Sequence, residues 1–141
     1  MYNRILVAID GSEQSEKALK SALKFANERY SKVTVMHVKK NITIYETMSS
    51  EVVDEMYSEM KKEADKLFNH AKALAEDYGV EIETYYVIGE PSTLIVKMAE
   101  EGNYQLIVMG SRGLGGIKGI MLGSVSQRVT QLSHCPVLIV K

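Results

Sequence analysis

Short apolar runs alternate along the chain with longer segments in which apolar residues recur every three or four positions. The first run, residues 5–9, is apolar throughout, which is typical of a parallel strand buried on both faces. The segment behind it, from Glu13 to about Tyr30, has apolar positions at helical spacing, Tyr30 among them, and Ser12 or Ser15 would cap this helix. The pattern predicts strands at 5–9, 33–38, 80–88, 106–109 and 137–140, and helices at 13–30, 51–78, 91–101 and 124–133.

Strands that alternate with helices form a parallel sheet covered by helices on both faces. The first and fourth predicted strands look most buried, whereas the third alternates apolar and polar residues like a half-exposed edge strand. We therefore predict an α/β fold in which residues 1–141 form a single domain. Its core is an open five-stranded parallel sheet of order 3-2-1-4-5. Ligands bind such sheets where the strand order reverses, here at the carboxyl ends of strands one and four.

The glycine-rich segment after strand four is the strongest candidate for chemistry. Six of the ten glycines of the chain lie in it, and Gly110 and Gly113 are followed after nine residues by Gly123 and Ser124. Glycine lets backbone amides converge on an anion, and Ser124 would begin a helix whose N–H groups and dipole favour a phosphate. A mobile loop without a ligand is the alternative interpretation. A Walker loop is excluded because the chain has no Gly-Lys pair, and the third glycine of the dinucleotide fingerprint is missing.

Polar side chains flank the same predicted crevice. Asp10 ends strand one, where its carboxylate could accept hydrogen bonds from ribose hydroxyls or bind Mg²⁺ shared with phosphates; the alternative is a helix cap or turn. Arg112 pairs with phosphate or is a solvated surface residue. Ser124 and Ser126 offer hydroxyls beside the helix amides, or one of them only caps the helix.

Composition excludes several classes of protein. The net charge of −1 and the pI of about 6.3 give no sign of a nucleic-acid or anionic-membrane partner. No apolar stretch approaches the ~20 residues of a membrane span, no signal peptide is visible, and the single cysteine fits a reducing cytosol. We expect a cytoplasmic protein. Its three histidines lack metal-ligand spacing, so no zinc site is expected, and His37 and Cys135 are expected to be packed side chains.

Methionine and tyrosine residues gather around the start of the long predicted helix, at positions 45, 48, 56, 57 and 60. The apolar stripe of this helix is expected to begin with Val52, Val53, Met56 and Met60. Core packing of the methionines is the simpler interpretation, and a lid or contact surface is the alternative. The connection at 39–50 that precedes this helix mixes polar with isolated apolar residues.

The sequence resembles the universal stress protein family, specifically its ATP-binding branch. The segments that carry the resemblance span the chain: ILVAIDGSEQSEKAL, VTVMHV, GEPSTLIVKMA, YQLIVMGSRGLGGIKGIMLGSVSQRV and HCPVLIVK. The nucleotide motif of the family is G-x-x-G, nine residues, then G-S or G-T, and Gly110, Gly113, Gly123 and Ser124 match it without a gap.

The resemblance implies a Rossmann-like fold of the adenine nucleotide alpha hydrolase type and a pocket for ATP, with Mg²⁺ or Mn²⁺ as an accompanying ion. Asp10 would meet the ribose or the metal, and the backbone of Val38 would bind adenine. The remaining implied contacts are Ile9 and Gly11 beside Asp10, Met109 and Gly110 at the adenosine, and Arg112, Gly113, Gly123, Ser124, Val125 and Ser126 at the phosphates. The family also implies a homodimer formed through strand 137–140.

These observations favour an ATP-binding regulatory protein of the cytoplasmic stress response, a nucleotide-dependent switch with little turnover and no catalytic residue. A slow ATPase or a nucleotidyl or phosphoryl transferase is the alternative. Such chemistry needs a group that positions the nucleophile and charge at the transferred phosphoryl group, and only Asp10 and Arg112 are candidates. The intact motif argues against a third class, a dimeric scaffold that binds no nucleotide.

Overall fold

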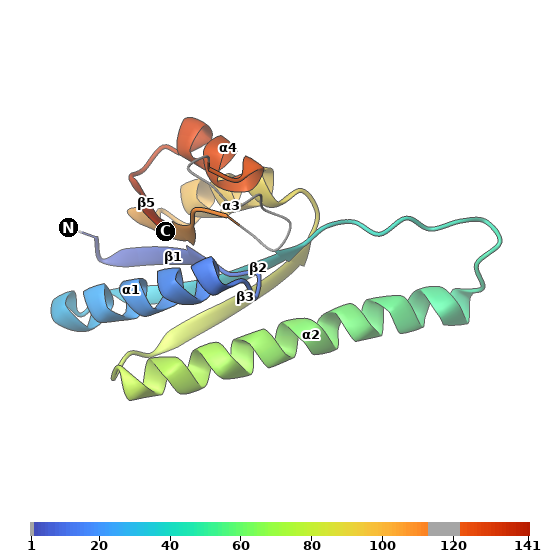
Figure 1. Ribbon diagram of the computed structural model, residues 1–141, viewed down its shortest axis with the longest axis horizontal. Coiled ribbons are helices and arrows are strands. Elements are labelled where there is room, and N and C mark those ends of the chain that lie inside the picture. The colour runs from blue at the N-terminus through green and yellow to red at the C-terminus, as the bar shows by residue number, and fades with distance from the viewer. Residues whose placement is uncertain (1, 113–121) are drawn as a thin grey trace.

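The computed structural model of the protein describes residues 2–112 and 122–141. Within these ranges strands and helices alternate in the predicted order (Figure 1). The strands are β1 (Arg4–Ala8), β2 (Lys32–Lys39), β3 (Ile82–Ile88), β4 (Leu106–Gly110) and β5 (Val137–Val140), and the helices are α1 (Glu13–Arg29), α2 (Ser50–Asp77), α3 (Pro91–Glu101) and α4 (Ser124–Leu132).

The strands form one parallel sheet in the order β3-β2-β1-β4-β5, which confirms the predicted order. β1 and β4 lie at its centre, and every residue of β4 is buried. β3 lies at one edge, where exposed Glu83 and Tyr85 alternate with half-buried residues. The period-two pattern of this strand therefore predicted its place correctly.

Helices cover both faces of the sheet (Figure 1). On one face, α1 and α2 bury a cluster that includes Leu19, Leu23 and Phe68 against β1 and β2. On the other, α3 and α4 bury Ile95 and Val129 against the centre of the sheet. Two apolar layers on one sheet provide the buried area that holds the strand ends, and the loops that leave them, in fixed positions.

Helix ends are fixed by local chemistry. Ser12 caps α1, as one of the two predicted alternatives had it, because its side chain accepts a hydrogen bond from the Ser15 amide. Gly79 follows α2 with φ of +69°, the left-handed conformation that suits glycine after a helix.

The prediction that Tyr30 belongs to the packed stripe of α1 is wrong. α1 ends at Arg29, and Tyr30 turns left-handed at φ +56° with 95% of its side chain exposed.

α2 packs on the sheet only in its second part. Its buried residues are Met60, Ala64, Phe68, Ala71 and Ala75. The predicted apolar stripe continues toward the start of the helix, but Val52 is exposed and Val53 and Met56 are only half-buried. This correction has a simple geometric cause, because the first turns of α2 project beyond the end of the sheet (Figure 1). In the part of the chain that the structure describes, no helix is long and apolar enough to cross a membrane.

Candidate functional site

The predicted crevice falls at the carboxyl end of β1, between its two neighbours β2 and β4. The Ile9 amide donates to the Met36 carbonyl of β2 at 2.9 Å, just after β1 ends. Alternate residues of a parallel strand point their N–H and C=O groups to the same neighbour. The backbone groups of Val38, two residues after Met36, therefore face the space beyond the end of β1.

The opposite wall of the crevice is the end of β4. Ile107 and Ser111 donate their amides to Pro136 and Val140, on the β5 side. By the same alternation, the N–H and C=O of Gly110 face β1 and the crevice. Backbone donors and acceptors on Val38 and Gly110 thus lie on both sides of the point where the strand order reverses, which is where ligands bind in parallel sheets.

The loop between β1 and α1 forms the floor. One carboxylate oxygen of Asp10 accepts the Ser12 amide at 2.9 Å, so Asp10 forms the turn that the sequence left open as an alternative. Gly11 has φ of +87°, a conformation that a residue with a Cβ adopts only with strain. The Asp10 amide points at the Ser15 hydroxyl, 3.3 Å away. These bonds hold the Asp10 carboxylate half-buried at the crevice, next to the start of α1.

Gly110 has a packing role that the sequence did not reveal. A Cβ placed on it would lie 2.7 Å from Cβ of Gln14 and 2.8 Å from its carbonyl carbon, in the first turn of α1. Real side chains do not approach backbone this closely, so only glycine lets β4 end against α1. The glycine of the motif therefore brings the two site loops together, independently of any ligand.

The helix N-termini at this edge of the sheet differ in how they are capped. α1, α2 and α3 have side-chain caps from Ser12, Ser49 and Glu90, and α1 and α2 also carry glutamates in the first turn. α4 begins after Gly123, with no side-chain cap bond and no acidic residue in its first turn. Its first N–H groups have no acceptor within the helix and lie at the positive end of the dipole. Among the described helices, α4 thus presents the N-terminus best suited to an anion.

Ser126 ties the two ends of the glycine-rich segment together. Its hydroxyl, 2% exposed, donates to the carbonyls of Ser111 at 2.9 Å and Gly123 at 3.0 Å. The Gly123 amide also donates to the Ser111 carbonyl at 2.7 Å. The Ser126 hydroxyl, expected beside the helix amides, thus binds two carbonyl groups of the protein itself. Ser111 contributes only its backbone here, so its side-chain type gave no signal of this role in the sequence.

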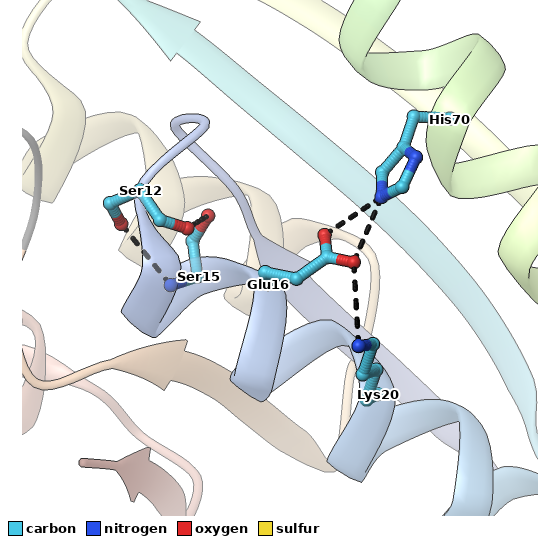
Figure 2. Close-up of polar contacts among 5 residues, drawn as sticks. All are labelled: Ser12, Ser15, Glu16, Lys20 and His70. Carbon is cyan, nitrogen blue, oxygen red and sulfur yellow. Dashed lines mark hydrogen bonds and ion pairs between the residues drawn. The ribbon is translucent and has the colours of Figure 1, made fainter.

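α2 contacts the floor of the crevice from the side. Nε2 of His70 lies 2.9 Å from both carboxylate oxygens of Glu16, and Lys20 lies 3.9 Å from the same carboxylate (Figure 2). Leu67, three residues before His70, lies against Gly11. The polar contacts are solvent-exposed, so they contribute little stability, but they place α2 beside the β1–α1 loop.

A polar groove lies between α2 and β3, away from the crevice. Its volume is about 420 Å³, and Lys61, Asp65, Asn69, Thr84 and Tyr86 line part of it. Burial raises the pKa of Tyr86, and its hydroxyl has no partner among the described residues. The Tyr86 ring stacks on buried His37, whose Nδ1 lies 2.8 Å from the Ile9 carbonyl oxygen, so His37 is packed as predicted.

Comparison with known proteins agrees with this geometry. The universal stress protein family matches the chain over residues 1–141. The universal stress protein YxiE of Bacillus subtilis (strain 168) is 44% identical over 148 residues, covering 100% of both chains. This chain belongs to the universal stress protein family.

Solved structures of similar proteins share the fold. The structure of hypothetical protein MJ0577 superposes with a TM-score of 0.88 at 35% identity, covering 100% of this chain and 96% of that one. A universal stress protein in complex with cAMP has a TM-score of 0.77 at 29% identity, covering 99% and 97%. The universal stress protein from Archaeoglobus fulgidus in complex with dAMP has a TM-score of 0.70 at 26% identity, covering 99% and 98%. Relatives of this chain thus bind adenine nucleotides.

The universal stress protein motif is divided between described and undescribed residues. The structure places the backbone of Val38 and Gly110, the carboxylate of Asp10 and the start of α4 around one edge of the sheet. Ile9, Gly11 and Met109 belong to the same strand ends, and Arg112, Ser124 and Val125 flank the glycine-rich segment. Gly113 lies outside the described residues. Within residues 2–112 and 122–141, no cluster of three or more histidine, cysteine or carboxylate side chains could hold a metal ion.

Proposed function

We propose that this chain is an ATP-binding regulatory protein of the cytoplasmic stress response, a nucleotide-dependent switch with little turnover. The observation that carries the proposal is the arrangement of backbone groups where the strand order reverses. Backbone groups of Val38 and Gly110 face each other across the end of β1, and the uncapped N-terminus of α4 lies at the same edge of the sheet. Relatives that hold cAMP and dAMP support an adenine nucleotide as the ligand.

The residues present suit the parts of the nucleotide. The Val38 backbone offers a donor and an acceptor for the adenine edge, as a strand does for its neighbour. The Asp10 carboxylate would accept hydrogen bonds from the ribose hydroxyls, or it would bind Mg²⁺ or Mn²⁺ that accompanies the phosphates. The first amides of α4, at Ser124, Val125 and Ser126, would bind phosphate oxygens. The metal would supply positive charge that offsets the charge of the phosphates.

Substitution at Ser124 tests the phosphate position. Ser124→Asp places a carboxylate at the first residue of α4, where it favours the helix dipole but repels a phosphate. We expect unchanged or slightly higher stability of the nucleotide-free protein, together with loss of the rise in melting temperature that ATP produces in the wild type. Ser124→Asn, of nearly equal size and neutral, is the matched control and should keep that rise. If Ser124→Asp responds to ATP like the wild type, the phosphates do not bind at α4.

Low turnover follows from the chemistry available. Phosphoryl transfer needs a group that positions the nucleophile and cations at the transferred phosphoryl group, and Asp10 already uses a carboxylate oxygen to bind the Ser12 amide. We expect well under about one ATP hydrolysed per minute per chain, near the rates of unassisted GTPases. Phosphate release by wild type and Asp10→Asn measures this. A rate above about one per second that is lost in the variant would make the protein an enzyme.

The dimer expected through β5 is part of the same proposal. β5 is an edge strand, and Leu138 on it is 41% exposed. An apolar edge invites pairing with a second copy about a two-fold axis. Because Pro136 and Val140 accept amides of β4, the alternate residues Val137 and Ile139 turn their backbone groups to the open edge.

This alternation selects the substitution for the test. Ile139→Pro removes a donor from the open edge and should give a folded monomer in sedimentation velocity. Leu138→Pro removes an amide that faces β4, so it should lower stability instead. A wild type that sediments as a monomer at concentrations of tens of micromolar would refute the dimer.

A further inference from the structure

Residues 40–59, here called the arm, project from the body of the molecule. The arm comprises the connection after β2 and the first turns of α2, and it extends past the end of the sheet (Figure 1). Every buried residue of α2 lies at Met60 or beyond. No residue of the arm is itself buried, so the arm has little support from the core.

The arm nevertheless carries large apolar side chains. Ile44, Tyr45, Val52 and Tyr57 are 48%, 61%, 45% and 37% exposed, and they make up half of the exposed large apolar residues found in the described chain. Val53 and Met56 precede Met60 at helical spacing, so they continue the stripe that packs on the sheet farther along α2. A stripe that continues past the surface it covers leaves an apolar helix face open.

The arm is strongly acidic. It contains Lys40 and five carboxylates, at Glu46, Glu51, Asp54, Glu55 and Glu59, for a net charge of −4 in a chain whose total is −1. The rest of the molecule is therefore net positive. Acidic side chains beside exposed apolar ones form a surface complementary to a helix with apolar and basic residues on one side.

We propose that the arm is a docking surface for a basic amphipathic helix of a partner protein. Such a helix would bury its apolar residues on Val52, Met56 and Tyr57 while its lysines or arginines pair with Asp54 and Glu55. Pairing between the arms of two copies of this chain fits less well, because two arms of charge −4 repel each other. The inference concerns a surface outside the nucleotide crevice and stands whether or not ATP binds.

The test uses the full nucleotide-free chain and a designed peptide. The probe is an amphipathic helix of about 18 residues built from leucine, lysine and one tryptophan. The chain has no tryptophan, so the fluorescence of the probe reports the peptide alone. We expect a saturable blue shift that weakens as salt rises from about 50 to about 500 mM. A peptide with glutamate in place of lysine should not bind.

Three double variants locate the site. Val52→Ser/Tyr57→Ser should weaken binding of the basic peptide by at least about tenfold. Tyr30→Ser/Leu132→Ser removes an aromatic and an aliphatic residue elsewhere that are more exposed, at 95% and 53%, and should leave binding unchanged. Asp54→Asn/Glu55→Gln should weaken binding and flatten its salt dependence. Because all these side chains are exposed, circular dichroism should show that each variant folds.

Three results would overturn the proposal. These are no saturable binding of the basic peptide, equal binding of the acidic peptide, or equal loss of binding in both serine pairs. Sedimentation velocity distinguishes docking of a partner helix from self-association of the protein. If the Val52 and Tyr57 variant loses a self-association that the wild type shows, the arm is an interface between copies and the proposed partner is wrong.

Discussion

Gly110→Ala tests the close packing of the two site loops. In the structure, the alanine methyl would lie 2.7 Å from Cβ of Gln14, 2.8 Å from its carbonyl carbon and 3.0 Å from its carbonyl oxygen. Two of these atoms are backbone in the first turn of α1, so the clash cannot be relieved by a side-chain rotation. Either β4 or the start of α1 has to move.

The expected cost follows from the size of the clash. Forcing one extra methyl group into a well-packed site costs typically about 1–3 kcal/mol. A chain of 141 residues has an unfolding entropy near the melting temperature of about 0.3 kcal/mol per kelvin. Gly110→Ala should therefore lower the melting temperature of the nucleotide-free protein by about 3–10 °C.

Calorimetry or a thermal-shift measurement without nucleotide distinguishes a packing role of Gly110 from a role in ligand binding alone. Our account predicts the loss of stability before any ligand is added, because the clash is with Gln14. Ser124→Ala, in the same motif but at an exposed position of α4, should leave the melting temperature nearly unchanged. If Gly110→Ala melts like the wild type and loses only its response to ATP, then the glycine serves the ligand alone and the packing argument is refuted.

Two further substitutions test contacts around the site. Ser126→Ala removes the hydroxyl that binds the Ser111 and Gly123 carbonyls and should lower the unfolding free energy by about 1 kcal/mol in urea titrations; an unchanged midpoint would contradict the assigned role. The hydrogen bond from the Ser92 hydroxyl lowers the pKa of Glu90 below its ordinary value of 4.5. Because the folded pKa is the lower one, Glu90 stabilises the protein above pH 4.5, and this contribution is lost as the pH falls through the folded pKa. Wild type should therefore exceed Glu90→Gln in stability at neutral pH, with a difference that shrinks on acidification; a difference that grows would contradict the sign.

The strand order, and the strand ends that it brings together, could be predicted from the sequence, because both depend on patterns that are local in the chain. A fully apolar strand at residues 5–9 and an alternating strand at 80–88 already indicate centre and edge. The role of Gly110 could not be predicted in this way. Its neighbour in space is Gln14, almost a hundred positions earlier, and no local pattern reports that distance.

The limits of helical periodicity explain the two corrections to the packed stripes. Spacing identifies which face of a helix is apolar, but not how far the surface beneath it extends. Val52 lies on the apolar stripe of α2 and is exposed because the sheet ends before it. Tyr30 follows the last helical residue of α1, where a left-handed residue turns the chain away. The contacts of the Ser126 hydroxyl could not be predicted from spacing either, because the Ser111 and Gly123 carbonyls that it binds come together only when the chain folds.

Titration of ATP into nucleotide-stripped protein by calorimetry tests the central claim most directly. The crevice between Val38 and Gly110, with the start of α4 at its edge, predicts saturable binding with one ATP per chain and a dissociation constant in the micromolar range or tighter, roughly −8 kcal/mol. Heats indistinguishable from dilution, measured on folded protein at ATP concentrations up to about 1 mM, would contradict the assignment of this site to a nucleotide.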